Sequence, residues 1–145
     1  MSERKFYTVR GYQLLDKSIT DLTPSLEDYM EMIYRKITTN GYIRVTELAQ
    51  ELNVKPSSVS KTLGKLVNLN MIDYQKYGVI KLTDRGWRVG KYLLWRHNVV
   101  NSFFEILAPK NPERGFAEAE RVEHILSRET VVQLENIIET LRNRE

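Results

Sequence analysis

The sequence contains no cysteine and only two histidines among its 145 residues. The absence of cysteine excludes disulfide bonds, zinc sites built on thiolates and iron–sulfur clusters. Any metal site must therefore use oxygen and nitrogen ligands. No apolar run approaches the roughly 20 residues that a transmembrane helix requires, and the first residues lack the apolar core of a signal peptide. We therefore expect a cytoplasmic protein.

The basic residues are unevenly distributed along the chain. The hydrophobic content of 41% and the charged content of 28% are typical of a globular protein with a buried core. Residues 55–91 contain eight lysines and arginines but only two aspartates, a net charge of +6, whereas the whole chain carries only +3. This segment suits a polyanionic partner such as nucleic acid. A lysine-rich, solvated surface would explain the charge equally well.

The first half of the chain predicts three helices. Thr23 followed by Pro24 is typical of a helix start, and an apolar stripe follows until the Asn40-Gly41 pair. A second helix should begin after Thr46. A third should begin at Pro56 and run to about Asn70.

The second half predicts a small hairpin followed by further helices. Aromatic and β-branched residues flank a glycine in residues 72–82, which indicates two short strands and a turn. The segment Thr83 to Gly86 should cap a long helix that ends near Leu107, and we interpret Pro109 to Gly115 as a loop. A short helix over about 116–126 and a last helix after Ser127 complete the mainly α fold. We divide the chain into an N-terminal extension (1–22), a winged helix-turn-helix DNA-binding domain (23–90) and an all-helical dimerisation domain (91–145), which the long helix 84–107 connects.

The order of helices and hairpin in residues 23–90 is that of a winged helix-turn-helix, in which the third helix enters the major groove of double-stranded DNA. Hydroxyl and amino groups at the start of that helix suit contacts to phosphates and base edges. The predicted DNA contacts are Lys55, Ser57, Ser58, Ser60, Lys61 and Lys65, with Lys76 and Tyr77 at the tip of the hairpin. The alternative is a small helical domain with serine caps and no ligand.

Residues 120–124 contain the most suggestive metal-binding pattern in the chain. Glu120, Glu123 and His124 occupy positions i, i+3 and i+4 and so share one face of a predicted helix. Spacing alone leaves open whether this face binds a divalent metal or is simply exposed. Taken singly, His97 is typical of a core histidine on an apolar stripe, and Asp28 with Glu31 is typical of a solvated surface pair.

Several segments resemble the manganese-regulator branch of the diphtheria-toxin-repressor family. The resemblance covers about residues 23–141, and its motifs are specific in combination. They are Thr23 to Glu31, Arg44 to Ala49, Pro56 to Lys61, Leu82 to Gly86, Arg96-His97 and Glu120 to Ser127.

This resemblance implies a homodimeric, metal-activated repressor of metal-uptake genes that binds a palindromic operator. It also implies a binuclear metal site that holds two Mn²⁺ ions per subunit. The implied ligands are Asp28, Glu31, His97, Glu120, Glu123 and His124. The iron-sensing branch uses a sulfur-bearing residue in place of Glu120, so a carboxylate there indicates manganese.

Other functions are compatible with parts of this pattern. A member of the same family could sense Fe²⁺ or Zn²⁺ instead. A metal-independent winged-helix regulator would use the basic segment alone. A binuclear metal hydrolase would use the carboxylates and histidines to activate water, but it would leave the basic segment without a role. We therefore expect that the protein is not an enzyme.

Overall fold

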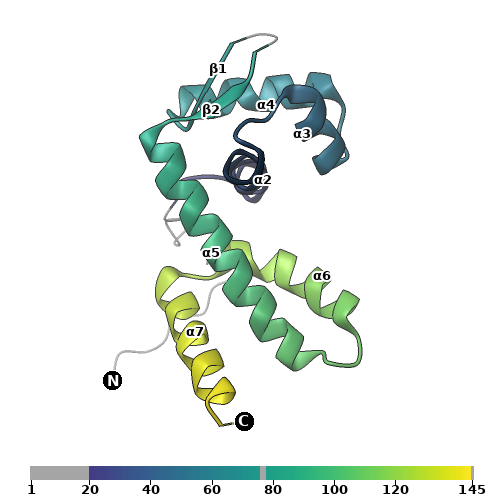
Figure 1. The fold of residues 1–145 in the computed structure, drawn as a ribbon, viewed down its shortest axis with the longest axis vertical. Helices are drawn as coiled ribbons and strands as arrows, with labels where there is room; N and C mark the ends of the chain where they lie inside the picture. Colours follow the sequence, from purple (N-terminus) through teal and green to yellow (C-terminus); the bar gives the residue numbers. More distant parts are fainter. Residues whose placement is uncertain (1–19, 76–77, 145) are drawn as a thin grey trace, which may run out of the picture.

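The computed structural model describes residues 20–75 and 78–144, which form a mainly helical protein (Figure 1). Its elements, in order, are α2 (Pro24–Asn40), α3 (Val45–Leu52), α4 (Pro56–Asn68), β1 (Ile72–Tyr74), β2 (Ile80–Leu82), α5 (Asp84–Leu107), α6 (Pro112–Val122), the 3₁₀ helix η1 (Glu123–Ile125) and α7 (Arg128–Arg142). The expected mainly α fold with a winged helix-turn-helix at its N-terminal end is confirmed.

Local capping explains where α2 begins and ends. The side chain of Thr23 accepts a hydrogen bond from the backbone N–H of Leu26 at 3.3 Å, and Pro24 occupies the first turn. Gly41 ends the helix with φ at 87°, in the left-handed region that favours glycine.

The two short strands form the wing. β1 and β2 are antiparallel, with Asp73 opposite Lys81 in the centre of the register. An isolated bridge between Ile43 and Ile80 attaches the wing to the turn before α3. The predicted tip residues Lys76 and Tyr77 lie outside the described residues, as does nearly all of the predicted N-terminal extension.

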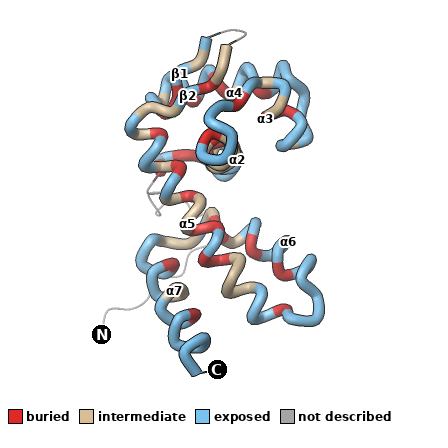
Figure 2. Tube along the Cα trace, viewed as in Figure 1, coloured by how far each residue is buried: buried red, intermediate tan, exposed pale blue. Residues whose placement is uncertain are grey.

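Helix α5 runs through the whole molecule and is shared by two apolar cores (Figure 2). It crosses α2 closely: a Cβ atom added to Gly90 would lie 2.7 Å from Tyr34. The larger core lies among α2, α3, α4, the wing and the first half of α5, and includes Met30, Ile33, Leu63, Leu66 and Leu93. The smaller core contains Val99, Val100, Ala119, Val131 and Ile138.

The structure corrects the sequence prediction between residues 109 and 126. We predicted a loop to Gly115, but α6 begins at Pro112, with Asn111 as N-cap accepting a hydrogen bond from the backbone N–H of Arg114. We also predicted one helix to residue 126, but α6 ends at Val122 and a 3₁₀ turn follows. Glu120 therefore does not share one continuous helical face with the residues of η1.

Within the described residues, no helix combines the length and the apolar character needed to cross a membrane.

Candidate metal centre

All six predicted metal ligands lie at the junction between the two cores. Three separate parts of the chain bring them there. Asp28 and Glu31 come from α2, His97 from α5, Glu120 from the end of α6, and Glu123 and His124 from η1. The close crossing of α2 and α5 at Gly90 holds the first two parts together, and the tight turn of η1 brings in the third.

His97 is the centre of the first group of side chains. Its Nδ1 atom lies 3.0 Å from Glu123 Oε2, 3.2 Å from Glu120 Oε1 and 3.6 Å from Glu31 Oε1. Candidate ligand atoms of Glu31, His97 and Glu123 all lie within 4.8 Å of one another. This half of the centre, which we call the His97 half, therefore gathers three carboxylates around one imidazole nitrogen.

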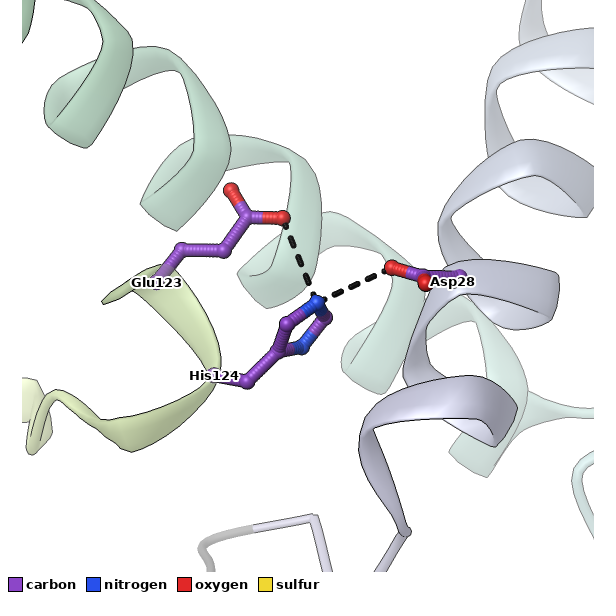
Figure 3. Close-up of side chains that lie close together, drawn as sticks. All are labelled: Asp28, Glu123 and His124. Carbon is purple, nitrogen blue, oxygen red and sulfur yellow. Dashed lines mark ion pairs between the residues drawn. The ribbon is translucent and has the colours of Figure 1, made fainter. Parts of the chain in front are cut away.

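His124 is the centre of the second group, the His124 half. Figure 3 shows its ring directed between Asp28, from α2, and Glu123, from η1. Its Nε2 atom lies 3.0 Å from Asp28 Oδ1 and 3.7 Å from Glu123 Oε1. Candidate ligand atoms of these three residues also lie within 4.8 Å of one another. Glu123 thus belongs to both halves, with one oxygen directed to each.

Glu123 also provides the test of whether a metal fits here. The residue is only 1% exposed, and its Oε1 atom is buried without a hydrogen-bond partner. A buried carboxylate oxygen without a hydrogen bond is costly and rare in native proteins. A divalent cation bound between Asp28 and His124 would satisfy this oxygen. The donor set, which consists of oxygen and nitrogen atoms, also suits such an ion.

The two imidazoles hold protons firmly in the absence of metal. Burial alone would lower the pKa of each ring, but hydrogen bonds to carboxylates and their negative charge outweigh burial. Glu120 and Glu123 are the main contributors at His97, where the pKa is raised to about 9. Asp28 contributes most at His124, where the pKa is raised to about 10. Because metal ligands must be deprotonated, a bound metal would have to displace these protons.

The carboxylates of the centre are not equivalent. Burial raises the pKa of Glu31 to about 7, with His97 opposing this rise and the charge of Glu123 adding to it. The hydrogen bond from His97 lowers the pKa of Glu120, which is half-exposed. Arg35 forms an ion pair with Glu31 at 2.9 Å, and so compensates part of the negative charge.

Sequence comparison agrees with the geometry of this centre. Residues 21–80 match the family model of the iron-dependent repressor N-terminal DNA-binding domain, and residues 83–144 match that of the iron-dependent repressor metal-binding and dimerisation domain. The HTH-type transcriptional regulator MntR of Oceanobacillus iheyensis is 39% identical over 116 residues, which cover 80% of this chain and 78% of that protein. The chain belongs to the iron-dependent repressor family. The resemblance drawn from the sequence motifs is thereby confirmed.

Other relatives agree with this family assignment. The MntR regulator of Listeria monocytogenes serotype 4a is 40% identical over 121 residues, covering 83% of this chain and 84% of that protein. Among solved structures, ScaR with bound Zn²⁺ is 28% identical, with a TM-score of 0.64, and the match covers 79% of this chain. The match spans about half of the ScaR chain, 53% of its length.

The family model places the DNA-binding function in the domain that contains α4. Six of the predicted DNA contacts lie on or next to the first three turns of this helix, and all six are exposed: Lys55, Ser57, Ser58, Ser60, Lys61 and Lys65. No acidic residue occupies the first turn of α4, and no side chain caps it. The basic residues and the helix N-terminus therefore face solvent without an internal anion.

Sequence reasoning missed four polar residues at or next to the centre. Glu27 and Arg96 are buried and form an ion pair at 3.1 Å, and Thr20 donates a hydrogen bond to Glu27. Asn101 lies 2.8 Å from His97 Nε2. The only signal in the sequence was that Glu27 and Arg96 each directly precede a predicted ligand. An acidic residue in the first turn of a helix normally needs no further explanation.

Proposed function

We propose that this chain is a Mn²⁺-responsive, DNA-binding transcriptional repressor of metal-uptake genes that acts as a homodimer in the cytoplasm. One observation carries the proposal. Glu123 in η1 faces both Glu31 and Asp28, which belong to the first helix of the DNA-binding domain, across the shared helix α5. A metal bound here would link the part of the protein that contacts DNA to the part that is expected to dimerise.

The donor set supports manganese and a binuclear site. Four carboxylates and two imidazoles without sulfur suit a hard divalent ion, and Mn²⁺ must be selected by ligand number and geometry because its intrinsic affinity is low. Glu123, with one oxygen directed to each half, is suited to bridge two ions. Two relatives carry the name MntR, whereas a solved relative is named with bound Zn²⁺. A zinc- or iron-sensing member of the family is therefore the alternative.

Metal would act here by charge neutralisation and by fixing distances. Without metal, the two protonated histidines would offset only part of the negative charge of the four carboxylates. A bound divalent ion would supply the positive charge that holds these segments together. The orientation of α2, and of α4 packed in the same core, would then depend on metal as a population shift. The relatives are named as transcriptional regulators, and we assign no catalytic role to this centre.

DNA binding during metal titration tests the proposal. Fluorescence anisotropy with a palindromic operator should show tighter binding with Mn²⁺ than with a chelator, by about 5- to 150-fold, the usual range of allosteric coupling. Repeating the titration with Fe²⁺, Co²⁺ and Zn²⁺ distinguishes the metal sensed. Unchanged DNA affinity in the presence of every metal would contradict the proposal.

Two variants separate the response to metal from DNA binding. Glu123→Gln should abolish the metal response because it removes the charged group common to both halves of the centre. Lys61→Ala, in α4, should weaken DNA binding and lower its salt dependence by about one charge, while metal binding stays unchanged. If Lys61→Ala bound DNA like the unmodified protein, Lys61 would not be a DNA contact.

A further inference from the structure

Glu27 is a buried carboxylate that is not one of the six proposed ligands. It is 2% exposed, and both of its oxygens are engaged. Oε1 lies 3.1 Å from His124 Nδ1. Oε2 lies 3.1 Å from the guanidinium of Arg96 and accepts a hydrogen bond of 3.0 Å from the hydroxyl of Thr20. Glu27 is not part of the candidate ligand group formed by Asp28, Glu123 and His124.

The ion pair that Glu27 forms with Arg96 is unusually well enclosed. Arg96 is 4% exposed, so both charges have lost most of their hydration. A buried ion pair is seldom a strong source of stability, because desolvation offsets the attraction, and its best-attested use is to specify one arrangement of the surrounding groups. The group that this pair faces is the His124 ring. Arg96 also lies 3.4 Å from His124 Nδ1.

We infer that Glu27, held in place by Arg96 and Thr20, positions His124 as a metal ligand. By accepting a hydrogen bond from Nδ1–H, Glu27 leaves Nε2 as the nitrogen available to metal. Nε2 is the atom that lies 3.0 Å from Asp28 and 3.7 Å from Glu123. Histidine ligands commonly donate their second ring N–H to a carboxylate or carbonyl, which fixes the ring and raises its basicity. This inference rests on the proposed function, since it assumes that the centre binds metal.

His97 has a different support, which offers an internal comparison. Its Nδ1 atom faces the carboxylates, and its Nε2 atom lies 2.8 Å from the amide nitrogen of Asn101. The amide oxygen of Asn101 is buried without a partner. Because the protonated ring also carries a hydrogen on Nε2, turning this amide over would let its oxygen accept a hydrogen bond from Nε2–H, and this bond would remain if Nδ1 bound metal. The His97 half thus has a neutral support, whereas the His124 half has a charged one.

This difference predicts that removing the charge of Glu27 weakens Mn²⁺ binding in the His124 half and leaves the His97 half nearly unchanged. The test variant is Glu27→Gln, which preserves side-chain size, combined with Arg96→Gln, which avoids leaving Arg96 as a buried, unpaired charge. Mn²⁺ binding is measured on the full chain by calorimetric titration. One class of Mn²⁺ site should weaken by about 10- to 100-fold, the usual effect of losing such a partner. The other class should change by less than about threefold.

A matched control is Glu135→Gln, which makes the same chemical change at a partly buried carboxylate that accepts a 2.8 Å hydrogen bond from Trp95 outside the centre. It should leave both Mn²⁺ affinities unchanged. Thermal melts of the metal-free variants verify folding. Equal weakening of both sites in the double variant would indicate general loosening and overturn the inference, as would unchanged affinity at both.

A readout that needs no metal separates this inference from the proposed function. In the metal-free protein, the Nδ1–H proton of His124 should give a sharp NMR signal that exchanges slowly with water, because a charge-assisted hydrogen bond to a buried carboxylate holds it. The double variant should lose that protection, whereas Glu135→Gln should retain it. Rapid exchange in the unmodified protein would overturn the role of Glu27 even if Mn²⁺ activates DNA binding. Slow exchange together with no Mn²⁺ binding would instead refute the proposed function.

Discussion

The two ends of α5 carry domains of very different construction. Among the described residues, the N-terminal core contains fifteen buried apolar side chains, whereas the C-terminal core contains five. The C-terminal part also leaves large apolar side chains exposed, including Ile106, Leu107, Phe116, Ile125, Ile137 and Leu141. The buried charged or polar residues of the C-terminal part, Arg96, His97 and Glu123, lie at the junction between the two cores.

This difference indicates that the two domains depend on different sources of stability. We expect the N-terminal core to be large enough to fold from its own side chains. The C-terminal domain presents apolar surface that a second copy of the chain would cover, in agreement with the proposed homodimer. The contacts of η1 with α2 use charged groups, His124 with Glu27 and Asp28, rather than apolar packing. Three experiments test this comparison.

The largest effect, a loss of folding stability, should follow a change in the N-terminal core. Leu63→Ala removes a fully buried side chain from α4 and should lower the free energy of unfolding by about 2–5 kcal/mol, because it leaves a cavity. Chemical denaturation of the metal-free protein measures this loss, which should not depend on protein concentration. Val67→Ala, at an exposed position of the same helix, is the control and should change stability by about 0.5 kcal/mol or less. A loss below about 1 kcal/mol for Leu63→Ala would contradict a self-sufficient N-terminal core.

The second effect, a loss of dimerisation, should follow a change in the exposed apolar surface of the C-terminal domain. Phe116→Glu places a charge on α6 where a partner subunit is proposed to pack. The change should weaken dimerisation by about 2 kcal/mol, or roughly 30-fold in Kd. Sedimentation velocity at several concentrations measures it. Val54→Glu, at a similarly exposed apolar position of the N-terminal domain, should leave the dimer intact. Equal dissociation by both variants would remove the contrast between the domains.

A third effect should come from pH, acting on the junction. The pKa values of His97 and His124 are raised to about 9 and about 10. The stability that these protonated rings supply is therefore fully present below pH 6.5 and is lost as pH rises through 9 to 10. Denaturation of the metal-free protein should show this decline, and His97→Gln should reduce it.

Mn²⁺ affinity should change in the opposite direction, because metal replaces the same protons and binds more tightly as pH rises. The loss caused by Leu63→Ala should remain the same at each pH, since no titrating group contributes to it. A pH-independent stability between pH 7 and 10 would contradict the protonated junction.

Local sequence signals predicted most of the helices because their causes are local. Thr23 and Pro24 start α2 as their residue types suggest, and Thr83 caps α5 by accepting a hydrogen bond from the backbone N–H of Gly86. The start of α6 was missed although Asn111 and Pro112 form the same kind of signal as Thr23 and Pro24. The 3₁₀ turn at Glu123 has no comparable signal, because a change of helix type depends on what packs around it.

In the candidate metal centre, too, some features could be predicted from the sequence and others could not. The sequence motifs were sufficient to nominate six ligands and the family, and the structure brings those six side chains together at the junction. The roles of Glu27 and Asn101 could not be predicted. Whether a carboxylate in the first turn of a helix is solvated or buried depends on the segments that pack against it, here α5 and η1.

The sequence by itself determined the residue types available for chemistry, the helix periodicity and most of the helix ends, since these depend on neighbours within a few positions along the chain. Only the tertiary structure decided which charges are buried, which oxygen of Glu123 faces which histidine, and which apolar side chains remain exposed. Those properties depend on contacts between residues far apart in sequence, and burial changes the cost of a charge far more than any local pattern does.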